Sequence, residues 1–277
     1  MVDCVMDLIN FCRAHGILID SMPPIGYWRR YPTDDHPNKR NGAVKFMGDH
    51  AFVQNHAMDT EVSVWQPDTP VKIDHARIAR ELQQVENRRR ADQQEAANKA
   101  AFIMKSCQLG RHDYLKRKGF PDAEGYIWVH EGKQFLILPM RVQGHLVGCQ
   151  MIDEAGGKKF LYGQRTSNAE IKIDNGGIDI LCEGYATALS IQSVLKRFKK
   201  RYVIHVCFSA GNMKKIAAGI TTLGIIVADN DESGTGERVA KEIGWKYWMS
   251  DVVGEDANDT HVRLGNFAFG QSLLKVL

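Results

Sequence analysis

The spacing of apolar and polar positions changes along the chain and predicts three kinds of structure. Residues 1–16 place apolar side chains at helical spacing. Residues 126–173 form short apolar segments separated by turns that contain glycine or charged residues, which predicts an antiparallel meander. From residue 177 onward, strongly apolar segments alternate with helical stretches. This last pattern predicts a parallel sheet whose two faces are both covered by helices.

These changes suggest four parts. Residues 1–70 combine the first helix with small hairpins, and residues 71–118 form a polar helical stretch rich in Lys and Arg. Residues 119–176 would be a β subdomain, and residues 177–277 a domain with a parallel sheet and flanking helices. The expected fold class is α/β in the last part and α+β overall.

Composition excludes several classes of protein. The 277 residues are 44% hydrophobic and 25% charged, as in ordinary globular domains. No apolar run is long enough to span a membrane, and the N-terminus contains acids where a signal peptide would be basic. The six cysteines are scattered without a C-x₂-C pair, which favours free thiols in the cytosol. A net charge of +3 does not by itself indicate a nucleic-acid partner.

Acidic side chains follow the predicted strands of the last part. Glu183 follows the first strand, Asp229 and Asp231 follow the third, and a further acidic group at 255–259 follows the fourth. Because ligands bind at the carboxyl ends of strands in such sheets, these acids should lie together, and their repulsion favours a bound cation. Hard oxygen ligands suit Mg²⁺ or Mn²⁺, which points to phosphoryl transfer. The alternative is that these acids are ordinary solvated loop residues. That explanation is reasonable for any one of the groups but weak for three groups at the ends of strands.

Two other interpretations of the second acidic group fail on spacing. The residues from Asp229 to Gly234 match the first half of an EF-hand loop, but Ala240 stands where a bidentate Glu is required. The sequence Gly234-Thr235-Gly236 lacks the spacing of a phosphate-binding P-loop. An ATPase or helicase motor is therefore not indicated.

Several of these motifs together resemble a known family. The segments are EGYATALS from Glu183, ADND from Ala228 and GTG from Gly234. In this order they resemble the Toprim domain of phage and plasmid primases related to the bacterial DnaG type. The resemblance implies that Glu183, Asp229 and Asp231 are catalytic and hold Mg²⁺ or Mn²⁺, and that Asp259 belongs to the downstream acidic motif of the metal site.

The resemblance extends upstream of the Toprim segment. The segments HDYL from His112, LPM from Leu138 and KKFLYG from Lys158 are similar to the region that precedes Toprim in these primases. Lys158, Lys159 and Arg165 are then candidates for holding template or nucleotide phosphates. Ordinary hairpin cations are an equally good explanation for each one.

The N-terminal part departs from the family. Primases of this type usually begin with a zinc ribbon, but residues 1–70 lack paired metal ligands, so no zinc is predicted. Other motifs resemble a metal-free version of that ribbon, which would bind single-stranded template through basic and aromatic side chains. The candidates are Trp28, Arg30, Lys39, Arg40 and Trp65. A pair of tryptophans closing a small β core is the simpler alternative.

The expected function is a DNA primase, a DNA-directed RNA polymerase that makes short RNA primers. Its partners would be single-stranded DNA, ribonucleoside triphosphates and a separate replicative helicase, with no membrane. A bacterial cytosol, and a phage or other mobile element as the source, would suit that role. The alternatives are a Toprim-type nuclease and a non-catalytic replication adaptor that binds single-stranded DNA.

Overall fold

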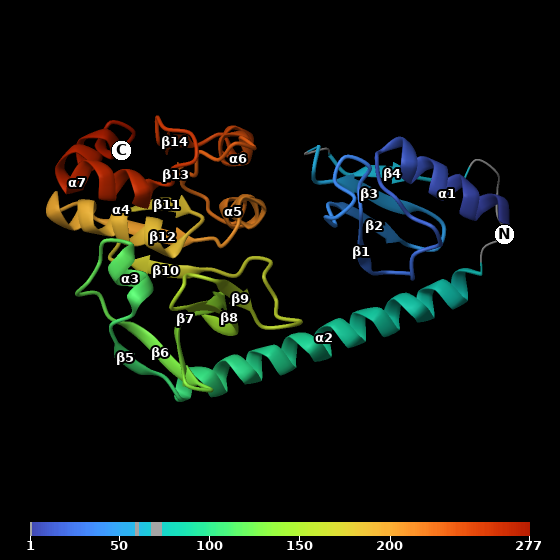
Figure 1. Cartoon of the computed structure of the whole chain (residues 1–277), viewed down its shortest axis with the longest axis horizontal. Helices are drawn as coiled ribbons and strands as arrows, with labels where there is room; N and C mark the ends of the chain where they lie inside the picture. The colour runs from blue at the N-terminus through green and yellow to red at the C-terminus, as the bar shows by residue number, and fades with distance from the viewer. Residues whose placement is uncertain (1, 59–60, 68–73) are drawn as a thin grey trace. The chain divides into compact units, whose positions relative to one another are not determined.

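The chain divides into two compact units, Met1–Ala91 and Asp92–Leu277 (Figure 1). The computed structural model describes residues 2–58, 61–67 and 74–277, so the expected boundary between residues 70 and 71 lies outside the described residues. No helix among these residues is long and apolar enough to cross a membrane. The cysteines at 12, 107, 149, 182 and 207 are free thiols.

The first unit is a helix packed on a small antiparallel sheet. Helix α1 (Val2–Ala14) precedes a sheet of order β1-β2-β3-β4. Its strands are β1 (Trp28–Tyr31), β2 (Gly42–Phe46), β3 (Ala51–Asn55) and β4 (Ser63–Trp65). Leu8 and Cys12 of the helix pack with Val44, Val53 and Trp65 of the sheet. This arrangement agrees with the apolar face predicted for residues 1–16.

The polar stretch expected at residues 71–118 is not one helix. Helix α2 (His75–Lys105) is followed by the short strand β5 (Gln108–Gly110) and the short helix α3 (Asp113–Arg117). The side chain of His112 caps α3 by accepting a hydrogen bond from the backbone N–H of Tyr114. Leu115 is buried beside Leu136 of the neighbouring sheet, so tertiary packing supplies a boundary that the polar pattern did not reveal.

The second unit contains the predicted antiparallel meander. The sheet has the order β5-β6-β7-β8-β9, with β6 (Gly125–His130), β7 (Lys133–Val142), β8 (His145–Asp153) and β9 (Lys158–Phe160). Gln143 and Gly144 connect β7 to β8, and both have positive φ, of 50° and 83°. Two consecutive residues with positive φ form the hairpin turn whose twist matches that of the strands, which explains the glycine there.

The third sheet confirms the predicted α/β fold class. Its order is β10-β12-β11-β13-β14, and its four strands after β10 run parallel. They are β10 (Ile171–Asp174), β11 (Ile178–Cys182), β12 (Tyr202–Val206), β13 (Ile225–Ala228) and β14 (Lys246–Met249). Strand β10 pairs antiparallel with β12, although we expected it at the end of the meander.

Helices cover both faces of this sheet, as the apolar strands predict. Helices α4 (Tyr185–Arg197) and α7 (Ala257–Leu274) share one core with it, and α5 (Ala210–Ala217) and α6 (Thr235–Ile243) share another. Phe269 of α7 packs edge-on against Trp248 of β14. The pattern analysis did not predict α7, which contains the non-helical Gly265 and has several polar residues in its first turn.

Candidate active site

The carboxylates that follow β11 and β13 meet at one edge of the parallel sheet. Strands β11 and β13 are hydrogen-bonded neighbours, with Cys182 opposite Val227. Glu183 directly follows the first strand, and Asp229 directly follows the second. The sequence-based expectation that these acids gather at the carboxyl ends of the strands therefore holds.

Asp229 lies in an environment that disfavours its ionised form. Burial raises its pKa to about 7, with further contributions from Glu183, Asp256 and Asp231. Its Oδ1 atom is buried and has no hydrogen-bond partner among the described residues. Burial and the charge of Asp231 also raise the pKa of Glu183. A cation bound here would reduce the repulsion between the carboxylates and would give Asp229 Oδ1 a partner.

The chain approaches Asp229 closely from helix α6. A Cβ atom at Gly236 would lie 2.3 Å from the backbone oxygen of Asp229, so glycine is required at this position. Asp231 is exposed, and its Oδ1 accepts hydrogen bonds from the backbone N–H and the hydroxyl of Ser233 at 2.9 and 2.6 Å. Close helix packing and this local turn fix the path of the loop that carries both aspartates.

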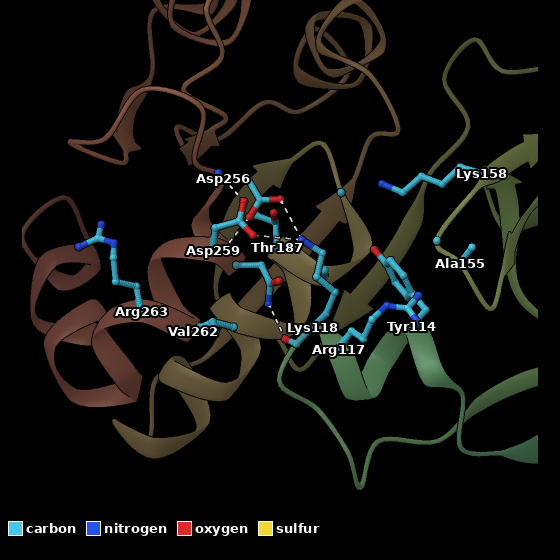
Figure 2. A pocket seen from close by; sticks show the side chains of 14 residues that line it. Tyr114, Arg117, Lys118, Ala155, Lys158, Thr187, Asp256, Asp259, Val262 and Arg263 are labelled. Atoms are coloured by element: carbon cyan, nitrogen blue, oxygen red, sulfur yellow. Dashed lines mark hydrogen bonds and ion pairs between the residues drawn. The ribbon is translucent and has the colours of Figure 1, made fainter.

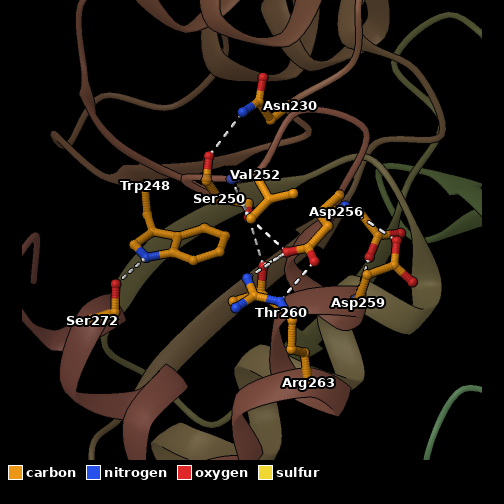
Figure 3. Close-up of polar contacts among 10 residues, drawn as sticks. Asn230, Trp248, Ser250, Val252, Asp256, Asp259, Thr260, Arg263 and Ser272 are labelled. Atoms are coloured by element: carbon orange, nitrogen blue, oxygen red, sulfur yellow. Dashed lines mark hydrogen bonds and ion pairs between the residues drawn. The ribbon is translucent and has the colours of Figure 1, made fainter.

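The downstream acidic group holds a second loop in place. Glu255 accepts two hydrogen bonds of 2.7 Å from Arg263 and others from Ser250 and Thr260 (Figure 3). The hydrogen bonds with Arg263 lower the pKa of Glu255 to about 2. Asn230 donates to the backbone oxygen of Ser250, which ties this loop to the one that carries Asp229.

Asp259 has a structural environment that the motif alone did not suggest. Asp256 caps α7, and the Asp256 and Asp259 side chains each accept a hydrogen bond from the other's backbone N–H (Figure 3). Asp259 also accepts a hydrogen bond from Lys118. Asp256 is among the charges that raise the pKa of Asp229. The predicted acidic group at 255–259 includes Asp256, but only Asp259 was assigned to the metal site, because the helix that Asp256 caps was not predicted.

A pocket of about 530 Å³ lies beside these acids. Its charged lining includes Arg117, Lys118, Lys158, Asp256 and Asp259, and Figure 2 shows them around one space. Gly184 and Thr187 from the start of α4 also line it. The Gly184 position has no side-chain cap, so the first N–H groups of this helix suit an anion such as a phosphate.

The acids fit a hydrated divalent cation better than a closed protein cage. Within the described part of the chain, no group of three or more His, Cys, Asp or Glu side chains is arranged to hold an ion by itself. Mg²⁺ commonly takes one or two carboxylates and completes its shell with water and phosphate oxygens. The unpartnered oxygen of Asp229 and the repulsion from Glu183 fit that mode of binding.

The three upstream cations that the sequence indicated lie in different places. Lys158 lines the pocket and counteracts the rise in the pKa of Asp229. Lys159 is exposed on β9, where neighbouring side chains point to opposite faces. Arg165 lines another pocket, with Lys215. The structure therefore brings only Lys158 to the acids.

The first unit places its candidate residues on different surfaces. Trp28 is 47% exposed, whereas Trp65 is 2% exposed and packs in the core. The expectation that Trp65 contacts the template is therefore corrected, because a buried ring has no surface on which a base can stack. Arg30 is exposed on β1, and Lys39 and Arg40 are exposed before β2.

One face of the first sheet combines aromatic and basic residues. Strand register places Trp28 opposite Lys45, Lys45 opposite Phe52, and Phe52 opposite Val64. Arg30 lies two residues from Trp28, so it projects from the same face. Side chains alternate between the two faces of β2 and β3, so Lys45 and Phe52 could have been assigned to the same face as Trp28 once the strand pairing was known. We call these five residues the outer face.

Comparisons with known proteins return matches of structure only. No protein-family model and no curated protein matches the chain. The primase fragment of the bacteriophage T7 primase-helicase has 14% identity and a TM-score of 0.43, covering 91% of this chain and all of that fragment. A second structure shows the bacteriophage T7 lagging-strand DNA polymerase with primase domains bound to an RNA/DNA hybrid and dTTP. This match has 18% identity and a TM-score of 0.43, covering 61% of this chain and 90% of the matched chain.

Proposed function

We propose that this chain is a Toprim-type DNA primase that joins ribonucleotides into short primers on single-stranded DNA. One observation carries the proposal: a buried, unpartnered carboxylate oxygen of Asp229 sits among Glu183, Asp231 and Asp256, beside a pocket lined by cations. Carboxylates that need a divalent cation, next to groups that suit phosphates, are what nucleotidyl transfer requires.

The side chains have distinct tasks in this proposal. Asp229, Asp231 and Glu183 would hold Mg²⁺ or Mn²⁺, which supplies charge neutralisation at the reacting phosphate. Lys118, Arg117 and Lys158 would bind the phosphates of the incoming ribonucleoside triphosphate. Glu183 has a raised pKa, so it is suited to accept the proton of the attacking 3′-hydroxyl.

The template would contact the outer face of the first unit. Trp28 and Phe52 offer rings on which bases can stack, and Arg30 and Lys45 offer charges for the backbone. A separate replicative helicase would open the duplex, and both would act in the cytoplasm of a bacterial host. A phage or other mobile element is the source that the resemblance suggests.

Primer synthesis on random-sequence single-stranded DNA tests the proposal. The purified chain, labelled ribonucleotides and Mg²⁺ should yield short labelled RNA, and Mn²⁺ should be tested in parallel. The double substitution Asp229→Asn and Asp231→Asn should abolish the product. Labelled DNA in a parallel reaction detects a nuclease through shortened strands, and DNA binding without either product would indicate the replication adaptor.

A further inference from the structure

A second cationic pocket lies on the α5 side of the parallel sheet. It has a volume of about 450 Å³, and its lining includes Arg165, Lys172, His205 and Lys215, with Glu170 as its acidic member. His205 projects from the same face of the sheet as Lys172, which lies opposite it on β10. None of the residues assigned above to the acidic site lines this pocket.

Arg165 and Lys215 are held side by side. Arg165 Nε donates to the backbone oxygen of Ser167 at 3.2 Å, and Lys215 Nζ donates to the hydroxyl of Ser167 at 3.2 Å. Neither cation has a carboxylate partner among the ion pairs of the described residues. Two neighbouring cations that no acid neutralises favour a bound anion.

The loop that carries Arg165 is firmly braced. Asn212 of α5 accepts a hydrogen bond from the backbone N–H of Asn168 at 2.7 Å and donates to the oxygens of Ala169 and Cys207 at 2.8 Å. Asn168 is held at a positive φ of 60°, in the left-handed region that few residues other than glycine adopt. A buried amide therefore fixes the loop before any ligand arrives, which lowers the entropy cost of binding.

His205 engages the acidic residue of the pocket. Its side chain lies between two carboxylates, with Nδ1 2.5 Å from Glu170 and Nε2 3.0 Å from Asp179. Only an imidazolium can donate from both nitrogens. Burial alone would lower the pKa of His205, but these two hydrogen bonds outweigh burial and raise it.

We infer that this pocket binds a phosphate group through Arg165 and Lys215, at a site separate from the acidic one. A phosphate from the backbone of a nucleic-acid strand and the phosphates of a free nucleotide share this chemistry. Lys172 also pairs with Asp174 at 3.3 Å, so we assign it a smaller part than the two unneutralised cations. The site goes beyond the proposed function, because it requires binding but no catalysis.

Equilibrium binding to the full chain tests the inference. The probes are a fluorescent single-stranded oligonucleotide and, separately, labelled ATP, each titrated at several salt concentrations. The test variant combines Arg165→Gln with Lys215→Gln. The control combines Lys246→Gln with Lys275→Gln, which removes the same charge from exposed positions of the same unit.

The test variant should bind at least one probe more weakly, by about 5- to 20-fold at ~0.1 M salt. For the oligonucleotide, the slope of log affinity against log salt should become shallower by about 0.7 to 1.4, as expected when a single strand loses one or two phosphate contacts. A loss confined to the oligonucleotide identifies a backbone phosphate, and a loss confined to ATP identifies a free nucleotide. If both probes bind the test variant as tightly as they bind the control, the site does not exist. The binding test does not depend on primer synthesis. If the chain makes no primers but the test variant binds a probe more weakly than the control does, only the primase proposal is refuted.

Discussion

Lys118 Nζ lies 3.2 Å from Asp259 Oδ1, and this ion pair joins the end of α3 to the first turn of α7. Asn258 strengthens the same junction by donating to the backbone oxygen of Lys118 at 2.8 Å (Figure 2). Residues distant in sequence thereby form one wall of the pocket beside the acids. Lys118 and Asp259 thus have a structural role before any substrate is bound.

This junction predicts different effects for two neighbouring aspartates. Asp259→Asn should reduce the free energy of unfolding by roughly 0.5–1 kcal/mol, because it weakens the capping box and the contact with Lys118. Asp256→Asn should weaken Mg²⁺ binding more, because Asp256 is one of the negative charges that act on Asp229. Calorimetric Mg²⁺ titration and chemical denaturation of both variants separate the two effects. Weaker Mg²⁺ binding in Asp259→Asn than in Asp256→Asn would show instead that Asp259 contributes more to metal binding.

Removing the charge of Asp229 should stabilise the metal-free protein. Its raised pKa means that the ionised carboxylate is destabilised in the folded state. We expect Asp229→Asn to increase the free energy of unfolding by roughly 1–3 kcal/mol at pH 8 without metal. The same variant should lose the rise in Tm that Mg²⁺ gives the wild type. Thermal unfolding with Mg²⁺ and with a chelator measures both effects, and a destabilised variant would show that Asp229 has a stabilising partner.

The sequence predicted the parts of the fold that depend on local periodicity. The apolar strands that end before Glu183 and Asp229 were expected at these positions, and both acids lie at the predicted edge of the sheet. The division of α2, β5 and α3 depends on packing between distant segments, such as Leu115 against Leu136. The spacing of polar residues within 71–118 carries no information about that contact.

The site could be predicted only in part for the same reason. A carboxylate immediately after a buried strand is visible in a sequence, whereas the charges that surround it in the fold are not. Asp256 and Asp259 are three residues apart in the same acidic segment, and the fold identifies Asp256 as one of the charges that act on Asp229. Trp28 and Trp65 likewise differ in burial because they lie on opposite faces of one sheet.

The contacts of His205 predict a pH-dependent stability. Its pKa is raised in the folded state, so its contribution is fully present below the unfolded pKa of about 6.5 and is lost as pH rises through the folded pKa. A neutral imidazole can donate to only one of the carboxylates of Glu170 and Asp179, and the other contact is then lost. His205→Asn should therefore destabilise the protein more at pH 6 than at pH 9, on the order of 1 kcal/mol per unit of pKa shift. Denaturant unfolding at both pH values, with the exposed His145→Asn as control, measures the difference. An equal loss at both pH values would mean that the pKa of His205 is not raised in the folded protein.

The outer face of the first sheet predicts which aromatic residue contacts the template. Trp28→Ala should weaken single-stranded DNA binding by about 1–3 kcal/mol, the usual contribution of one stacked base, because its ring is exposed between Arg30 and Phe52. Phe52→Ala should have a smaller effect, since this ring packs against both Trp28 and His50. Met58→Ala is a suitable control, because Met58 is exposed in the same unit and lies off the strands of this sheet. Fluorescence anisotropy with a labelled oligonucleotide compares the three variants, and circular dichroism checks that each one remains folded. If Trp28→Ala binds DNA as well as Met58→Ala does, the outer face does not hold the template.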